Sequence, residues 1–495
     1  MVTHKSWAEE AAAFNKEAFI KSASIKKRLE LGMIDCIAMA LKNNSEIQVK
    51  KITPLIEDAN VKIQKARFEP DLSFDFTMED NTDLSSTTLS GRTTTKTKTD
   101  IFNFGYGQKL VSGTKLDINF YNTRTRSNSI IQNLNPEFNS EAEVTITQPL
   151  LKGFGLIVNK ADFLIAKNNK LKSNHDLAEE VINILTDIKK SYYDFQYNQE
   201  QYKAALISLK RVQDLYDINK EKYAKGLTSN VDLLQSEAEV ARFEEAVLAA
   251  KAVMDMAEDN LKLITNIVDD PELWNASIVL LENLTYEKEA VDLIDAIKKA
   301  FDHRPDYEGA KVDLKSKDIS VIYYRNGMLP TLDLVGSYGL NGLGKNYEKD
   351  LSHIGGGKYP DWVVGVSVKM PLGSDEEKGN YEKSKLTKKQ ALIGFKRLEQ
   401  KIMLEVRNAI RNVDTSYRMI EASIKARDAE RENYEAQGSR FNAGLVSTLD
   451  IITYQERLTR AEVNFIKSVI DYKISLAELA RAEGMTLIND NIKME

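Results

Sequence analysis

The sequence predicts a mixed α/β protein made of two copies of one unit, in which very long helices alternate with amphipathic strands. The first observation is a repeat: residues 221–235 (EKYAKGLTSNVDLLQ) and 439–453 (SRFNAGLVSTLDIIT) align without a gap. Their glycines, Gly226 and Gly444, lie 218 residues apart in a chain of 495. The second observation is a change of apolar period in each half, from about 3.6 to 2. We therefore expect two structural repeats in one integrated body.

Each repeated stretch is typical of a turn between two helices. A glycine just after a helical pattern adopts the left-handed conformation that ends a helix, and a Ser or Thr beyond it can cap the next helix. Asp232 and Asp450 then fall in the first turn of the following helix. A carboxylate is favourable there because the helix dipole is positive at that end.

Composition excludes several classes of protein. Charged residues make up 29% and hydrophobic residues 42% of the chain, and no apolar run reaches about 18 residues. The chain is thus neither disordered nor a bundle of membrane helices. The net charge of −6 gives no reason to expect a nucleic-acid partner. Cys36, the single cysteine, is expected to be a small buried side chain.

Residues 1–28 are polar, and we expect them to form an N-terminal extension. They lack the apolar core of a secretory signal, so an exported protein would be represented here in its mature form. A helix is expected over residues 31–68, and Pro54 should kink or divide it.

Alternating apolar and polar residues predict strands within residues 71–151 and again within 331–371. Residues 100–124 should form a hairpin with a tight turn, whereas the polar stretches 80–99 and 127–140 should be loops. Tight turns on one side and long loops on the other are typical of an outer-membrane barrel with lipid outside and water inside. A soluble antiparallel sheet with one wet face fits the same alternation, and this alternative stays open here.

The helical segments after the strands are unusually long. Residues 159–224 would span roughly 100 Å at 1.5 Å per residue. Their apolar residues step by four and three, which is the pattern of a coiled-coil seam. A helical wall of this length does not bury its own apolar face in a monomer, and closing it into a tube by symmetric assembly is an economical solution.

The predicted organisation follows the chain in five parts. They are an N-terminal extension, 1–28; a first repeat, 29–265, with helix 31–68, strands within 71–151, helix 159–224, tip 225–230 and helix 231–265; a connector, 266–290; a second repeat, 291–484, with helix 291–324, strands within 331–371, helix 381–442, tip 443–448 and helix 449–483; and a C-terminal tail, 485–495.

No motif indicates an enzyme, a cofactor or a metal site. The four histidines are scattered without ligand spacing. Residues 339–346 (GLNGLGKN) nearly spell a phosphate-binding loop, but Asn346 replaces the Ser or Thr that would hold Mg²⁺. No helical pattern follows them at once, so we expect a surface loop.

The paired tips, the order of elements and the opening LELGMIDCIAMALKNNSEI resemble the TolC-like outer membrane efflux protein (outer membrane factor) family over nearly all of residues 30–485. The resemblance implies a homotrimer whose pooled strands form a transmembrane β-barrel, continued by a long α-helical periplasmic tunnel. It implies an outer-membrane location reaching into the periplasm. It also implies two partners, a periplasmic adaptor and an inner-membrane transporter of the RND, ABC or MFS class.

The implied function is a passive duct for efflux or type I secretion, opened at its periplasmic tips. A soluble coiled-coil scaffold with a small sheet is the alternative. By resemblance, the adaptor-docking residues are Gly226, Leu227, Thr228, Gly444, Leu445, Val446 and Ser447. By resemblance also, the residues at the periplasmic entrance are Asp232, Phe441, Asp450 and Thr453.

The sequence departs from the family pattern at this entrance. Val446 replaces an Arg, Phe441 replaces a Tyr and Thr453 replaces an acidic residue. A closed state therefore needs another lock, for which apolar contact among Phe441, Leu445 and Val446 is a hypothesis. The usual subunit gives four strands, so the extra hairpin would make a barrel of 18 strands rather than 12, unless it folds outside the barrel.

Overall fold

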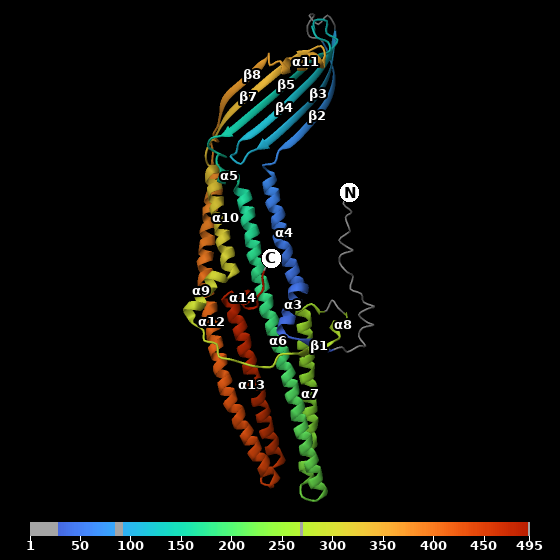
Figure 1. The fold of residues 1–495 in the computed structure, drawn as a ribbon, viewed down its shortest axis with the longest axis vertical. Coiled ribbons are helices and arrows are strands. Elements are labelled where there is room, and N and C mark those ends of the chain that lie inside the picture. The colour runs from blue at the N-terminus through green and yellow to red at the C-terminus, as the bar shows by residue number, and fades with distance from the viewer. Residues whose placement is uncertain (1–27, 85–92, 268–270, 494–495) are drawn as a thin grey trace. The chain divides into compact units, whose positions relative to one another are not determined.

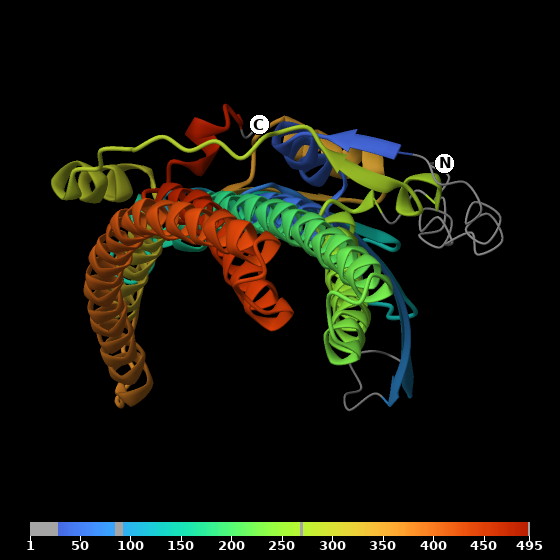
Figure 2. The same cartoon turned by 90° about the horizontal axis from the view of Figure 1, so that it is seen from below.

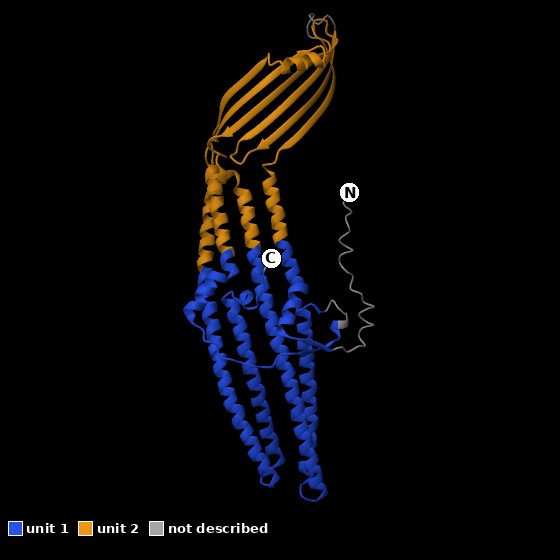
Figure 3. Cartoon of the chain, in the orientation of Figure 1, with its two compact units in different colours: residues 1–53, 174–308, 397–495 blue, residues 54–173, 309–396 orange. Residues whose placement is uncertain are grey.

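The protein is described by a computed structural model for residues 28–84, 93–267 and 271–493. The chain divides into two compact units, and each unit takes segments from both sequence repeats (Figure 3). Unit 1 comprises residues 1–53, 174–308 and 397–495, and unit 2 comprises residues 54–173 and 309–396.

Unit 2 contains a six-stranded antiparallel sheet (Figure 1). In order of pairing, its strands are β2 (Asp71–Leu84), β3 (Thr94–Lys109), β4 (Lys115–Ser127), β5 (Glu137–Pro149), β7 (Thr331–Gly344) and β8 (Pro360–Lys369). The hairpin that the sequence left unplaced lies inside this sheet, because β3 pairs with β2 and β4 pairs with β5. The strands β2 and β8 are the two edges of the sheet.

The strands are longer than the sequence indicated. Residues 80–84 and 94–99 were predicted to be loop, but they pair across β2 and β3. Similarly, β5 begins at Glu137, inside the second predicted loop. The prediction was wrong because it treated polar Thr- and Asn-rich composition as a loop signal, although Thr is favoured in strands and a wet sheet face accepts polar side chains. Residues 85–92 of the predicted loop lie outside the described residues.

The two faces of the sheet differ in chemistry, because successive side chains of a strand point to opposite faces. One face is apolar across all six strands, and we call it the apolar face. Its members are Leu72, Phe74, Phe76 and Met78 of β2, Phe102, Phe104 and Tyr106 of β3, Ile118 and Phe120 of β4, Val144 and Ile146 of β5, Leu334, Tyr338 and Leu340 of β7, and Trp362, Val364, Val366 and Val368 of β8. The opposite, polar face carries Asp75, Glu79, Asp117, Asn119, Glu141, Glu143, Asp333, Asn341 and Asp361.

A short helix, α11 (Tyr347–Gly355), lies against the sheet, at the end of the strands where β2 finishes and β3 begins (Figure 1). Its Asp350 is fully buried beside Gly342 and accepts a hydrogen bond from Ser140. The expectation of a surface loop at residues 339–346 was wrong: β7 runs to Gly344, and Asn346 caps α11 by accepting a hydrogen bond from the Lys349 amide at 3.1 Å. The sequence signal was weak because α11 has only nine residues.

Several helices contribute residues to unit 2. They are α4 (Ser45–Ala66), α5 (Leu156–Asn159), α6 (Ala161–Ala224), α10 (Pro305–Gly327) and α12 (Asp375–Asn442). Within this unit polar contacts link them in pairs. Asn168 of α6 donates to the Ser316 hydroxyl of α10 at 3.1 Å, and Lys388 of α12 lies 2.5 Å from Asp318 of α10.

The first predicted helix, over residues 31–68, is two helices, and the break is not at Pro54. The helix α3 (Met33–Asn43) ends at Asn44, whereas α4 continues through Pro54. The Asn44 side-chain oxygen accepts hydrogen bonds from the Glu46 and Ile47 amides at 2.9 and 3.2 Å, which caps α4. Its amide group donates to the Ile264 carbonyl at 2.9 Å, so this buried Asn also ties the break to the end of α7 (Asn230–Ile264).

The predicted helix 291–324 is also divided. The helix α9 (Leu293–His303) ends at Arg304, and α10 begins at Pro305. A residue before proline is disfavoured in the helical conformation, which accounts for the break. The remaining elements of unit 1 are β1 (Arg28–Leu31), β6 (Ser277–Leu280), α8 (Pro271–Trp274), α13 (Thr448–Ala482) and α14 (Thr486–Asn489).

The two larger apolar cores in the described part of unit 1 lie one beside each long helical hairpin. The first core joins Leu185, Ile188, Tyr192 and Phe195 of α6 to Cys36 and Leu261. Cys36 is fully buried, as predicted. The second core joins α12, α13 and α9 through Ile402, Val406, Ile420, Ala300, Tyr472 and Leu479. The strands β1 and β6 pair in parallel beside the first core.

The helices α6 and α7 bury only part of their apolar residues within the chain. On α6, Leu206 is 41% exposed, and the buried stripe passes through Ser208, Val212, Leu215 and Asn219. On α7, most large apolar residues are solvent-exposed within the chain, and Val231 and Leu248 are 72% and 69% exposed. An apolar face this long is left without a partner in the single chain.

Candidate functional site

The first candidate site is the turn that joins α6 to α7. The Leu227 amide donates to the Lys222 carbonyl at 2.8 Å, and the Gly226 amide donates to the Tyr223 carbonyl at 2.9 Å. This pair of bonds is the Schellman motif, which requires a left-handed residue. Gly226 supplies it with φ of +70°.

The turn between α12 and α13 repeats this geometry. The Leu445 amide donates to the Arg440 carbonyl at 2.9 Å, and the Gly444 amide donates to the Phe441 carbonyl at 3.0 Å. Gly444 has φ of +74°. The predicted left-handed conformation is confirmed at both glycines, and the two turns form the same hydrogen bonds.

Each turn leads into a capping box at the start of the next helix. Ser229 accepts from the Asp232 amide at 3.2 Å, and its own hydroxyl and amide donate to the Asp232 carboxylate at 2.6 and 3.3 Å. Ser447 and Asp450 form the same three bonds at 3.3, 2.7 and 3.1 Å. The hydrogen bond from the serine hydroxyl is the main cause that lowers the pKa of each carboxyl group, so both groups are ionised at neutral pH.

The residues expected to dock an adaptor lie on the solvent side of these turns. Leu227 and Leu445 are 73% and 68% exposed. Ser447 is exposed, and Thr228 and Val446 are half-buried. Each turn thus presents one apolar side chain on a rigid, doubly capped loop.

Phe441, expected at the entrance, is only 7% exposed and packs with Leu215, Ile451 and Ile452. The Lys222 ammonium lies 4.3 Å from the centre of its ring, a cation–π distance. Within the single chain Leu445 lies outside this cluster and is 68% exposed, so contact among Phe441, Leu445 and Val446 in a closed state stays a hypothesis. Val446 does pack against the Phe441 cluster.

Sequence reasoning missed a buried polar ladder between α6 and α13. The Asn219 amide group donates to the Thr448 hydroxyl at 3.1 Å, and the hydroxyls of Ser208 and Thr459 lie 2.8 Å apart. Gln455 donates to the Ser208 carbonyl at 2.9 Å. These bonds join the two helical hairpins, α6–α7 and α12–α13, within one chain. Figure 2 shows the course of these helices. The available signal was a helical stripe on which Ser208 and Asn219 alternate with Val212 and Leu215.

The remaining entrance residues do not join this ladder. Asp450 and Thr453 are exposed, and the Thr453 hydroxyl donates to the Leu449 carbonyl of its own helix at 2.9 Å. Asp232 is half-buried at the start of α7.

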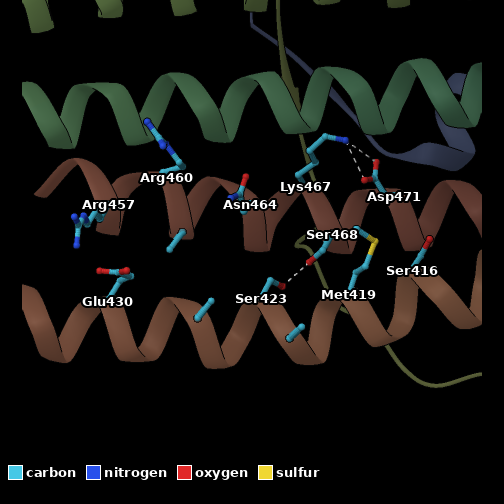
Figure 4. A pocket seen from close by; sticks show the side chains of 13 residues that line it. Ser416, Met419, Ser423, Glu430, Arg457, Arg460, Asn464, Lys467, Ser468 and Asp471 are labelled. Atoms are coloured by element: carbon cyan, nitrogen blue, oxygen red, sulfur yellow. Dashed lines mark hydrogen bonds and ion pairs between the residues drawn. The ribbon is translucent and has the colours of Figure 1, made fainter. Parts of the chain in front are cut away.

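A groove of about 750 Å³ lies between α12 and α13 (Figure 4). Small side chains line it, and charged groups stand along it. Its residues are Ser416, Met419, Ala422, Ser423, Ala426, Glu430, Arg457, Arg460, Ala461, Asn464, Lys467, Ser468 and Asp471. The Ser423 and Ser468 hydroxyls bridge the helices at 2.8 Å. Small residues of this kind allow another helix to approach closely.

The described residues contain no group of three or more His, Cys, Asp or Glu side chains arranged to hold a metal ion. Among the same residues, no helix is both long and apolar enough to cross a membrane.

An amphipathic antiparallel sheet joined to two helical hairpins with matching capped turns defines the class of outer-membrane channel proteins. The sequence profile of the family described as "Outer membrane efflux protein" matches residues 115–266 and 296–485, which is more than half of the chain. The chain therefore belongs to the outer membrane efflux protein family, and the resemblance inferred from the tips is confirmed. It is a protein of the bacterial outer membrane that extends into the periplasm, so the alternative of a soluble scaffold is excluded.

The chain is similar to the "Outer membrane protein TolC" of Vibrio cholerae, with 21% identity over 61% of this chain and 67% of that protein. It is also similar to the "Probable efflux pump outer membrane protein TtgC" of Pseudomonas putida, with 20% identity over 61% of this chain. The alignment spans 60% of the length of TtgC.

Solved structures share the fold. A membrane protein from Pseudomonas aeruginosa aligns with a TM-score of 0.67 at 16% identity, covering 91% of this chain and 92% of that one. The CmeC outer membrane channel of Campylobacter jejuni aligns with a TM-score of 0.66 at 17% identity, covering 93% of this chain and 90% of that one.

We expect acid to loosen the capped turns. The folded pKa of Asp450 is lowered, so its capping contribution is complete above the ordinary Asp pKa of about 3.9 and is lost as the pH falls through the lower folded value. A lower hydrogen-exchange protection factor at the start of α13 below about pH 4 than at neutral pH would report this loss. Ser447→Ala should cost about 1 kcal/mol and lower that protection at both acidic and neutral pH. The intact Ser229 cap is the internal control at neutral pH, where equal protection at both turns of the variant would contradict the assignment.

Proposed function

We propose that three copies of this chain form a passive export duct, the outer-membrane component of a tripartite efflux or type I secretion system. An adaptor protein opens the duct at the two capped turns, and an inner-membrane transporter of the RND, ABC or MFS class drives the cargo. The chain itself carries out no chemical reaction and binds no cofactor. Membership of the outer membrane efflux protein family supports this proposal.

The exposed seam of α7 is the observation that supports assembly. Leu234 and Met256 lie on this helix with Val231 and Leu248, and all four are more than half exposed. Burying such side chains yields about 25 cal/mol for each Å² removed from water, which favours a helical neighbour along the full length of α7. In a closed threefold assembly, a neighbouring copy covers this face.

In the assembly, the three sheets close one barrel of 18 strands. Each sheet has an even number of strands, so β8 of one copy can pair antiparallel with β2 of the next copy all around the ring. The apolar face then meets lipid, and the polar face with its carboxylates lines the water-filled lumen.

The capped turns form the periplasmic end of the duct. Gly226, Leu227 and Thr228 of one turn, and the matching residues of the other, dock the adaptor. Asp232, Asp450 and Thr453 line the entrance, and the buried Phe441 packs behind it. Three ionised Asp450 carboxylates around an axis repel one another and favour cations at the mouth.

End-on projection images of the detergent-purified particle test the proposal. We expect threefold symmetry and a barrel about 1.5 times as wide as one of 12 strands, because barrel diameter grows roughly linearly with strand number. Deleting residues 85–136 joins β2 to β5 and should narrow the barrel to the width of 12 strands. A solid helical bundle without a central water-filled channel would refute the duct. An unchanged barrel width after the deletion would place the hairpin outside the barrel.

A further inference from the structure

At the end of the strands where β2 finishes and β3 begins, a band of basic residues borders the apolar face of the sheet. Above the pair Phe76–Phe102, the next row of side chains on that face holds Asp100 and Arg124, which lie opposite each other in the register. One row further, Lys98 lies directly opposite Arg126, and Lys96 follows on β3. Lys96, Lys98, Arg124 and Arg126 therefore stand on one face, and we call them the basic band.

Two of these four charges are neutralised within the sheet. The Lys98 ammonium lies 2.8 Å from the Asp80 carboxylate, and Arg124 lies 3.5 Å from Asp100 and 5.6 Å from the centre of the Phe138 ring. Phe138 in turn packs against Tyr347 of α11. Arg124 and Lys98 are thus held in place by neighbouring side chains.

The other two charges, on Lys96 and Arg126, have no such partner. Both side chains are exposed, and neither forms a hydrogen bond or ion pair with another side chain in the described part of the chain. They are diagonal neighbours across β3 and β4, a separation of about 7–8 Å that two long side chains can close. The Asn128 side chain fixes the strand ends here, because it accepts from the Lys96 amide at 2.9 Å and donates to the Thr94 carbonyl at 3.2 Å.

Lys96 and Arg126 carry like charges and lie diagonally across β3 and β4. An anion bound between them would offset their mutual repulsion. A guanidinium group binds phosphate oxygens through paired N–H donors, and an ammonium group adds a compact charge.

We propose that the basic band binds the phosphate group of an anionic membrane lipid, with Lys96 and Arg126 as its direct ligands. The inference rests on the proposed function, in which the apolar face meets the bilayer. Continuity with that face favours a lipid: the band lies two to six residues beyond Phe102, roughly 7–20 Å along the strand, so acyl chains on Phe76 and Met78, which are 57% and 70% exposed, would place a headgroup at its level. The polar face carries carboxylates at the corresponding height, which disfavours an anion there.

The test uses the full chain reconstituted in nanodiscs of phosphatidylcholine with a minor share of phosphatidylglycerol, followed by native mass spectrometry of retained lipid. The double variant Lys96→Gln/Arg126→Gln should retain at least tenfold less phosphatidylglycerol than the parent chain, since each basic residue near an anionic surface contributes substantially to lipid binding. The matched control is Lys109→Gln/Lys115→Gln, which removes the same charge from the opposite face and should retain phosphatidylglycerol as the parent does.

Each remaining outcome decides the question. The inference is overturned if the parent chain retains the two lipids equally, or if the variant and its control lose phosphatidylglycerol equally. Either result leaves the proposed duct function unaffected. Displacement of the bound phosphatidylglycerol by inorganic phosphate alone, in the absence of lipid competitors, would identify a free-phosphate site and also overturn it. Failure of the parent chain to enter the nanodisc would refute the proposed function, and the inference with it.

Discussion

Replacing Arg304 by methionine should lower the free energy of unfolding by about 3–5 kcal/mol, the cost of removing one partner from a buried ion-pair network. The Arg304 guanidinium bonds the Asp306 carboxylate through two nitrogens at 3.0 and 2.7 Å and Glu405 at 2.7 Å. It also donates to the Ala482 carbonyl at 3.3 Å. One side chain thus joins the α9–α10 break to α12 and to the end of α13. Its loss leaves the largely buried Asp306 carboxylate without a cation, and it leaves Glu405 only its pair with Lys401 at 3.5 Å.

Chemical denaturation followed by circular dichroism measures this effect. The matched control is Arg418→Met, which removes an exposed pair with Asp414 on α12 and should change stability by no more than about 0.5 kcal/mol. Adding Glu405→Gln to Arg304→Met should recover part of the loss, because a neutral amide needs no cation. If the two arginine variants are equally stable, the network does not hold the junction.

The features that the sequence predicted well are local ones. The capped turns depend on Gly226 or Gly444 followed within a few residues by Ser and Asp, and every bond of the Schellman motif and the capping box lies within six residues. The long helices were evident because a periodic apolar stripe persists over many turns. A strand face was also evident where apolar residues alternate.

The breaks and strand ends were harder to predict because they depend on competition between local signals. Pro54 lacks an amide donor, yet α4 tolerates it; Asn44 ends α3 because its side chain caps α4 and also reaches Ile264, 220 residues away. Thr94 to Thr99 read as a loop by composition, although an adjacent β2 supplies their backbone partners. Neither Ile264 nor β2 belongs to the segment whose structure it determines, so the local sequence does not indicate these contacts.

The site was predictable only in part for the same reason. The turns could be found from two short stretches, but the polar ladder joins residues more than 220 positions apart in the sequence. Ser208 and Asn219 resemble ordinary surface residues until α13 is placed against them. The exposure of the α7 seam could likewise not be predicted, because it depends on which other helices of the chain pack against α7.

The second large effect should come from loosening that ladder. We expect Asn219→Ala to raise the open probability of the reconstituted duct on the order of tenfold. The substitution leaves the buried Thr448 hydroxyl without its partner, at a cost of about 1–3 kcal/mol, and 1.4 kcal/mol is a factor of ten in an equilibrium constant. We expect this free-energy change to favour the open state of the duct, because the bond joins the two helical hairpins that meet at the proposed entrance.

Single-channel recording in planar bilayers measures the open probability. The direction of its change distinguishes a lock between the hairpins from a purely structural contact. A lock between hairpins predicts more frequent or longer openings at an unchanged unit conductance. A purely structural role predicts lower thermal stability without a change in gating. Gln213→Ala is the matched control, since this side chain only bonds Asp217 one turn further along α6 at 3.4 Å and should leave gating unchanged.

Adding Lys222→Gln to Asn219→Ala should open the duct further, because the Lys222 ammonium lies over the Phe441 ring beside the same turn. A cation–π pair is worth about 0.5–2 kcal/mol, so a further twofold or larger increase is expected. The Arg and Tyr of the family pattern are missing here, and these two contacts are among the intramolecular links beside Phe441 and Thr448. If the double variant gates like the parent chain, the hairpins are held by contacts between subunits, and the α7 seam becomes the place to look for the lock.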